Sequence, residues 1–505
     1  MGMDPIEQLK RDVREGRIDL DRLIGIIVSQ QRQLEAARQP IEELQKKLSG
    51  RPTASNAKVD QAYSMRAEEK RQRDRGQQNK RKLSRRGRRG RLNNADKIKM
   101  AERTEPCYPQ DVPQEDCWLS HTRAVWRLQQ GRAVRIAYPI YRGPGNRYGQ
   151  IPGVLGRGEF GMEIIVEIAY LVYVLGLSFN KVAVLLQFMQ HLPLGKTQVD
   201  ALLRRLSRHW QHEFDVLCTL LAHSLVVHSD ETSWSINSVW AFLSEKARLL
   251  FFGVHKDAQT LKQILDPETF AGLLLSDDYA VYANFSPSQK CWAHLLRKAI
   301  KLTLQAPDNA EYRVFADRLL EIYRKACRVQ RDGRLGDAGR KRKVAALDDE
   351  ILELCVAVWV LELPPLEPSP ENDYRLLVNE VMRLMLDQQL FRFVTTPAAS
   401  QPNGQSTPVS GTNNESERTL RSQAQARDTG RSNKTMIGAR RQTILVRVLE
   451  SLRLYLPSFT LDAIVAEIKR WQQVGQSCFT SFLQKMGLVS PSESILDNLL
   501  PAPDG

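Results

Sequence analysis

Three acidic residues stand where a metal-dependent reaction on phosphates would need them. Asp230 follows an apolar run at 225–227, and Asp277 follows another at 273–275. An acid at the end of a buried strand points into the crevice at the carboxyl edge of the sheet, where ligands of α/β proteins usually bind. The third acid, Glu417, opens a helical run that also carries arginines.

Together these carboxylates predict a site for two Mg²⁺ (or Mn²⁺) ions. Two ions roughly 3.5–4 Å apart suit phosphodiester cleavage, because one activates the attacking water and the other stabilises the leaving oxygen. Carboxylates suit Mg²⁺, which prefers oxygen ligands. An isolated Asp after a strand is often only a turn or cap residue. The joint occurrence favours a catalytic triad, with Arg418 and Arg421 holding DNA phosphates beside it.

The chain around Asp230 has the pattern of a mixed α/β sheet. Apolar runs predict strands at 225–230, 239–243, 249–254 and 272–276, with a further strand at 289–292. Asp257 is expected to cap a helix between the third and fourth of these strands. Three antiparallel strands, a helix and a strand returning beside the first are the order expected of a ribonuclease H-like core.

The overall composition favours an intracellular protein that binds a polyanion. Of its 505 residues 42% are apolar, and the formal net charge is +15. This length predicts several domains. No apolar run reaches the roughly 18 residues that a membrane span needs, and the start of the chain lacks the pattern of a signal sequence. We therefore expect DNA as a partner, no membrane association and a cytoplasmic, nucleoid-associated location.

The first hundred residues predict self-association and non-specific DNA binding. In 1–50, apolar residues recur at intervals of seven from Leu20 to Leu48, which favours a coiled coil; Pro40 would kink it, and an amphipathic hairpin is the alternative.

Segment 51–104 is expected to be a basic disordered linker, because 66–91 holds thirteen Lys or Arg against three acids. Such a tract either binds phosphates or is only a solvated linker. The DNA-binding candidates in it are Arg85, Arg86, Arg88 and Arg89.

The next two segments could also read DNA. Segment 105–155 is expected to be irregular and similar to a degenerate zinc finger; Cys117 and His121 have the spacing of half a site, but Cys107 has no near partner, so zinc is not expected. Segment 156–222 has helical periodicity, with Ser178 and Thr197 as expected caps. The basic residues of its last helices favour a helix-turn-helix, although an ordinary α-hairpin fits equally well. Those basic residues are Lys196, Arg204 and Arg205.

The rest of the chain divides around the acids. We expect the catalytic domain at 223–308 and 413–445, a helical insertion with a loop at 309–412, and C-terminal helices at 446–505. The regions before and after the α/β core are thus expected to be all-α.

Four stretches in this order resemble the core of IS66-family bacterial insertion-sequence transposases. They are HSDETSW at 228–234, LLSDDYAVY at 274–282, CWAHLLRK at 291–298 and NNESERTLR at 413–421. The resemblance runs from about residue 148 to residue 456. It implies a ribonuclease H-like DDE transposase that uses divalent metal, cuts DNA at terminal inverted repeats and joins the 3′ ends to a target.

The resemblance places the triad on Asp230, Asp277 and Glu417. It also puts Trp292 and His294 near the active site, the first in packing and the second, with Arg297, against DNA phosphate. The neighbouring acids Glu231, Asp278 and Glu415 then either have no role in catalysis or only position the triad residues. The resemblance further implies a homo-oligomer and two small accessory proteins of the same element.

The chain departs from the family pattern in two ways. Asp278 stands where the family usually has Gly, which adds negative charge at the site. The cysteine-rich module is reduced to Cys107, Cys117 and His121. Two other functions therefore stay open, a catalytically impaired DNA-binding protein and a structure-specific nuclease on the same fold.

Overall fold

The computed structural model describes residues 92–360, 368–491 and 494–500. At its centre is a five-stranded mixed sheet in the order β7-β6-β5-β8-β9. The β5/β6 and β6/β7 pairs are antiparallel, whereas β5/β8 and β8/β9 are parallel. The strands are β5 (Val226–Ser233), β6 (Ser238–Ser244), β7 (Arg248–Val254), β8 (Leu273–Ser276) and β9 (Ser288–Lys290). This sheet confirms the predicted mixed α/β class.

Burial on both faces explains why these runs form strands. Every residue of β6 is buried, including Trp240 and Phe242, as suits a central strand covered on both sides. Helix α9 (Ala258–Ile264) makes the crossover to β8, and its predicted cap is confirmed, since the Asp257 side chain accepts a hydrogen bond from the Thr260 amide.

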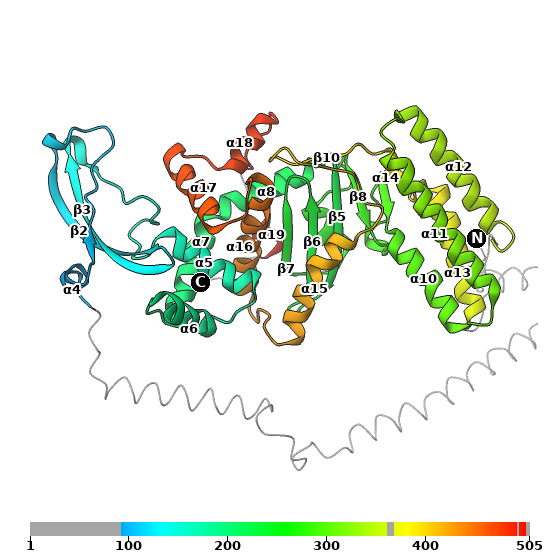
Figure 1. Cartoon of the computed structure of the whole chain (residues 1–505), viewed down its shortest axis with the longest axis horizontal. Helices are drawn as coiled ribbons and strands as arrows, with labels where there is room; N and C mark the ends of the chain where they lie inside the picture. The colour runs from blue at the N-terminus through cyan, green and yellow to red at the C-terminus, as the bar shows by residue number, and fades with distance from the viewer. Residues whose placement is uncertain (1–91, 361–367, 492–493, 501–505) are drawn as a thin grey trace, which may run out of the picture. The chain divides into compact units, whose positions relative to one another are not determined.

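Helices from distant parts of the chain cover the sheet (Figure 1). Helix α15 (Asn414–Asp428) contacts β5 and β6, while α16 (Met436–Tyr455) packs on β7 and on α8 (Gln211–Ala222). Helix α16 is buried on most of its circumference, which marks it as a core helix. Its buried Arg447 donates to the Leu250 carbonyl at 2.8 Å and covers the Phe251 ring.

A second apolar core lies among the helices that follow β9. Trp292 is fully buried there, and its indole N–H donates to the Leu390 carbonyl at 2.6 Å. The helices are α10 (Trp292–Gln305), α11 (Ala310–Arg331), α12 (Asp337–Cys355), α13 (Pro370–Leu386) and α14 (Arg392–Thr395). The loop after them carries the two-residue strands β10 (Ala399–Ser400) and β11 (Ser406–Thr407). Trp292 therefore packs, as expected.

The expectation of an irregular segment at 105–155 is wrong, and so is that of an all-α N-terminal region. Strands β2 (Trp118–Gln129) and β3 (Arg132–Gly143) form a long antiparallel hairpin. Gln130 and Gly131 both have positive φ, as a tight two-residue hairpin turn requires. Neither strand shows a regular alternation of apolar and polar residues, and the nearby Pro, Gly and Cys favoured an irregular segment. Short elements flank the hairpin, namely α4 (Asn94–Lys99), β1 (Arg103–Thr104) and β4 (Arg147–Tyr148).

The cysteines and the histidine of this region contact neighbouring protein groups. Cys107 is buried in the apolar cluster of the hairpin. The thiol of Cys117 donates to the Pro113 carbonyl at 3.3 Å, and His121 lies beside the hydroxyl of Ser120.

Residues 162–222 are helical, as predicted. Ser178 caps α6, since its side chain accepts from the Lys181 amide. Thr197 is not the cap of α7; Gly195 takes that place, and the Gln198 side chain accepts from its amide at 2.9 Å. The elements are α5 (Met162–Ala169), the π-helix η4 (Tyr170–Val174), α6 (Phe179–Gln190), α7 (Lys196–His209) and α8.

Helices also make up the regular structure described after α16. They are α17 (Leu461–Val474), α18 (Cys478–Lys485) and α19 (Ile495–Leu499). Within the described ranges, no helix combines the length and the apolar character needed to cross a membrane. The predicted heptad segment 1–50 and the basic tract with Arg85, Arg86, Arg88 and Arg89 lie outside the described residues.

Candidate active site

The two candidate aspartates lie at the same edge of the sheet. In the parallel pair β5/β8, Val226 lies beside Leu273 and His228 beside Leu275. Two further residues along this register bring Asp230 level with Asp277, which directly follows β8. Strand β5 does not end at Asp230 as predicted, because its antiparallel pairing with β6 continues to Ser233. Asp230 therefore lies just beyond the point where the neighbouring strand β8 ends, while its own strand β5 continues.

The electrostatics of Asp230 show that negative charge gathers here. Burial raises the pKa of its carboxyl to about 7, and the charges of Glu231, Asp277 and Glu417 add to the rise. The Glu231 amide donates to its Oδ1 at 3.0 Å and partly opposes this effect. Among the described residues, no Lys, Arg or His side chain forms an ion pair with Asp230. Carboxyl oxygens gathered in this way are the donors that hard divalent cations prefer.

Glu417 reaches this cluster from the first turn of α15. Its Oε1 accepts from Arg297 Nη2 at 2.6 Å and lies 3.7 Å from His294 Nδ1. Both partners belong to α10. Burial lowers the pKa of His294, and the adjacent Arg297 charge lowers it further, so the imidazole is neutral near pH 7. The structure thus brings Glu417, His294 and Arg297 together, and Arg297 binds the carboxylate.

A buried asparagine that sequence reasoning missed fixes α15 over the sheet. Asn413 is fully buried, and its Nδ2 donates to the Ser229 carbonyl at 2.7 Å. Its own amide donates to Cys291 Sγ at 3.1 Å, and the Ser416 hydroxyl donates to its carbonyl at 2.9 Å. Asn413 therefore ties the start of α15 to β5 through its side chain and to the start of α10 through its backbone amide. The only signal in the sequence was its place just before Glu417.

The acids next to the triad each have a basic partner. Glu231 Oε1 pairs with Lys256 at 2.8 Å, and its Oε2 accepts from the Tyr282 hydroxyl. Glu415 pairs with Arg248 at 2.5 Å, and Asp278 pairs with Arg383 of α13. Asp230 thus shares its site with other acids, whereas each of these three residues forms an ion pair with a basic side chain.

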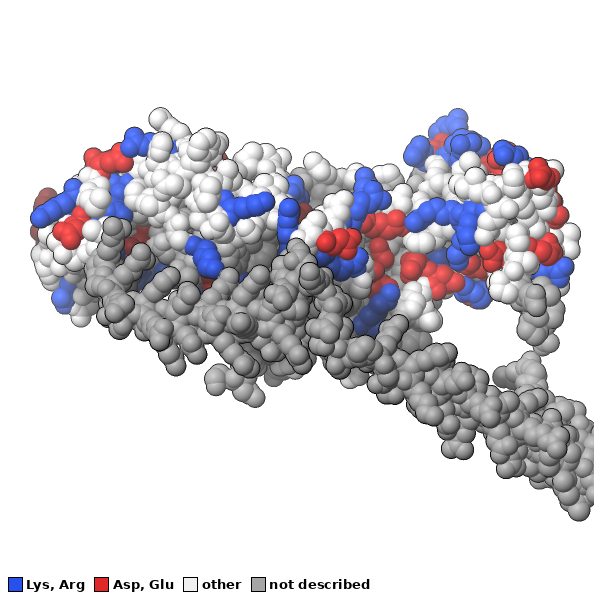
Figure 2. Space-filling view, turned by 90° about the horizontal axis from the view of Figure 1, so that it is seen from below, with Lys and Arg blue, Asp and Glu red and all other residues white. Residues whose placement is uncertain are grey.

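The remaining DNA-binding candidates fall on two separate elements. Arg418 and Arg421 are exposed on α15, beside the acidic cluster. Lys196, Arg204 and Arg205 are exposed on α7, which packs mainly on α5, α6 and α16. Arg204 is occupied in a pair with Asp200 at 2.9 Å. Seen from below, the described surface shows acidic side chains gathered among lysines and arginines (Figure 2).

Comparison with known proteins identifies the family. No curated protein matches the chain. The family described as "Transposase IS66 family" matches residues 157–441, more than half of the chain. The matched range includes the whole five-stranded sheet, the helices that follow it and α15. On this match the chain belongs to the IS66 family of transposases.

Proposed function

We propose that this transposase cuts DNA at the terminal inverted repeats of its element and transfers the freed 3′ ends to target DNA. Its catalytic centre is the triad Asp230, Asp277 and Glu417 on a ribonuclease H-like core. The observation that supports this proposal is the register that sets Asp230 of β5 level with Asp277, together with the charge of Glu417 on α15, which adds to the rise that burial causes in the pKa of Asp230.

The donor set fits two Mg²⁺ or Mn²⁺ ions, which the three triad carboxylates would hold. When bound, such ions activate the attacking hydroxyl and stabilise the leaving oxygen. Asp230 must lose its proton to serve as a ligand. Its neighbours oppose that loss, so the free site favours any divalent cation that relieves their repulsion.

The surrounding residues have separable roles in this proposal. Neutral His294 and the cation Arg297 face Glu417 from α10, where they can hydrogen-bond a scissile phosphate once Glu417 turns to metal. Arg418 and Arg421 hold the flanking backbone through charge-assisted contacts. Lys196, Arg204 and Arg205, together with Arg85, Arg86, Arg88 and Arg89, bind DNA farther from the site. A homo-oligomer, with the small accessory proteins of the element, places two DNA ends together.

Strand cleavage and joining on one labelled substrate test this function. A duplex carrying the inverted repeat that flanks the reading frame is incubated with Mg²⁺ and a target plasmid. Wild-type protein should release a 3′ end and join it to the plasmid. Asp277→Asn should abolish both products, while the matched control Asp278→Asn should retain them.

The same assay separates the other two functions. Cutting without a joined product would identify a structure-specific nuclease. Specific DNA binding without any cutting, with the accessory proteins present, would identify a DNA-binding protein that has lost catalysis. Equal activity of the two aspartate variants would contradict the triad.

A further inference from the structure

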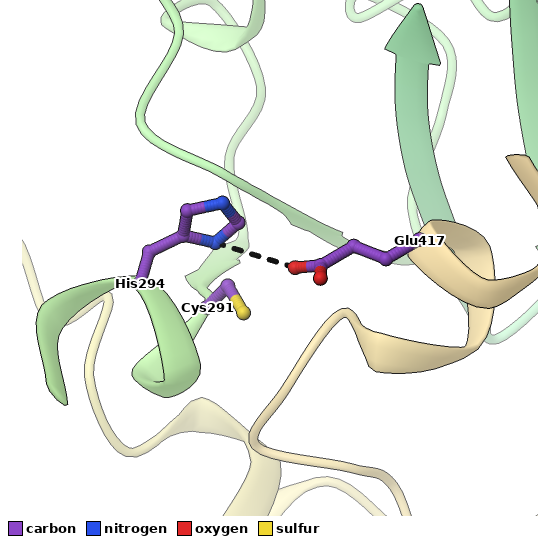
Figure 3. A group of neighbouring side chains, drawn as sticks. All are labelled: Cys291, His294 and Glu417. Carbon is purple, nitrogen blue, oxygen red and sulfur yellow. Dashed lines mark ion pairs between the residues drawn. The ribbon is translucent and has the colours of Figure 1, made fainter. Parts of the chain in front are cut away.

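Beside the triad lies a second set of ligand atoms, of mixed chemistry. Cys291 Sγ, His294 Nδ1 and a carboxylate oxygen of Glu417 all lie within 4.8 Å of one another. Cys291 is the N-cap of α10 and His294 lies in its first turn, whereas Glu417 comes from α15. Figure 3 shows the imidazole and the thiol on one side, facing the carboxylate on the other.

His294 Nδ1 lacks a partner in this arrangement. The atom is buried, and within the described part of the chain no group is close enough to hydrogen-bond it. Glu417 Oε1, at 3.7 Å, is beyond hydrogen-bonding distance. A buried ring nitrogen without a hydrogen-bond partner calls for an explanation, and a cation placed between it and the carboxylate would bind both groups.

Several backbone N–H groups face the sulfur of Cys291. The Asn413 amide donates to the sulfur at 3.1 Å. Burial raises the pKa of Cys291, and the backbone N–H groups of Asn413, His294 and Ala293 oppose part of that rise. Such N–H groups stabilise a thiolate whose proton has been displaced by metal, as they do at the start of helices generally.

These distances suit a tetrahedral ion after a small contraction. Bonds of about 2.0–2.3 Å to sulfur, nitrogen and oxygen place tetrahedral ligand atoms roughly 3.4–3.7 Å apart. His294 and Glu417 already meet that separation. The Arg297 side chain, which holds Glu417 at 2.6 Å, is 55% exposed and so is free to withdraw.

We propose that Cys291, His294 and Glu417 form a Zn²⁺ site, with water as the fourth ligand, that competes with the catalytic metals for Glu417. One thiolate, one imidazole and one carboxylate select Zn²⁺ over Mg²⁺, because Mg²⁺ takes oxygen ligands. Binding releases the Cys291 proton to solvent, and the two negative ligands balance the ion's charge. Its inhibitory consequence rests on the function proposed above, since Zn²⁺ would remove one acid from the triad.

Cobalt titration of the full-length protein tests the site without any DNA. Co²⁺ substitutes for Zn²⁺ and gives a thiolate charge-transfer absorption band when sulfur is a ligand. Wild-type protein should show this band, and Zn²⁺ should remove it. Cys291→Ser and His294→Gln should each weaken binding by at least about 100-fold, while Cys117→Ser, which alters the other Cys/His pair, should leave the band unchanged. Thermal melts of the metal-free variants verify that each is folded.

Inhibition is then measured as the fraction of each protein's own zinc-free cleavage. Zn²⁺ should inhibit wild-type protein, and Cys291→Ser should need at least a tenfold higher concentration for the same inhibition. An unchanged band in folded Cys291→Ser would overturn the site. Asp277→Asn keeps the two proposals apart, because it should bind Co²⁺ normally while making no cleavage product.

Discussion

Replacing Asp230 by Asn should stabilise the metal-free protein at alkaline pH. The folded protein raises the pKa of this carboxyl from 3.8 to about 7. A raised acid pKa means that the folded state binds the proton more tightly than the unfolded state. Ionised Asp230 therefore destabilises the fold, with a cost that is absent below pH 3.8, grows as the pH rises and is complete above pH 7.

The size of this effect follows from the two pKa values. One pKa unit corresponds to about 1.4 kcal/mol, so a rise from 3.8 to about 7 sets an upper limit of about 4 kcal/mol. Because Asp230 is partly exposed and shares its site with other acids, solvent screening reduces this limit, and we expect about 2 kcal/mol at pH 8. Asn has nearly the same shape and carries no charge, so it should avoid most of this cost.

Urea unfolding in the presence of a chelator measures the difference at pH 8, 6 and 4.5. The gain in Asp230→Asn should shrink steadily as the pH falls. Glu231→Gln is the matched control and should instead lower stability, since it weakens the pairing with Lys256. Addition of Mg²⁺ should stabilise wild-type protein and not Asp230→Asn. A gain that is absent at pH 8, or equal at all three pH values, would refute this account of Asp230.

Two further substitutions test how the site is held. Asn413→Ala should lower the free energy of unfolding by about 2–3 kcal/mol and reduce DNA cleavage, because buried groups lose their partners; the exposed neighbour Asn414→Ala should change stability by under about 0.5 kcal/mol in the same urea titration. Asp278→Gly removes the ion pair with Arg383 and should cost at most about 1 kcal/mol in thermal unfolding, because both side chains are partly exposed. Cleavage by Asp278→Gly should match the wild type; a loss comparable to that in Asp277→Asn would give Asp278 a direct role.

The sheet was predictable because its strands are continuous apolar runs bounded by polar residues. The runs before Asp230 and Asp277 predicted β5 and β8, and the crossover between them followed from Asp257 as a helix cap. The continuation of β5 to Ser233 was not predictable from hydrophobicity, because Asp230–Ser233 is polar and depends on pairing with β6.

Long-range contacts explain most of what the sequence did not reveal. Asn413 joins β5 and α10 across more than a hundred residues, and no local pattern specifies such a bond. The β2–β3 hairpin was missed because its strands lack a regular alternation of apolar and polar residues and because turn-forming residues around them dominated the interpretation. The partners of Asp278 and Glu415 likewise come from distant elements.

Anomalous diffraction from crystals soaked in Mn²⁺ tests the central claim most directly. Mn²⁺ replaces Mg²⁺ at oxygen sites, and its anomalous signal locates it without assumptions about the ligands. We predict a strong peak bound by the carboxylates of Asp230 and Asp277, with Glu417 turned from Arg297 toward the metals. A protein that cleaves DNA with Mn²⁺ but shows its only peak away from Asp230 and Asp277 would contradict the account.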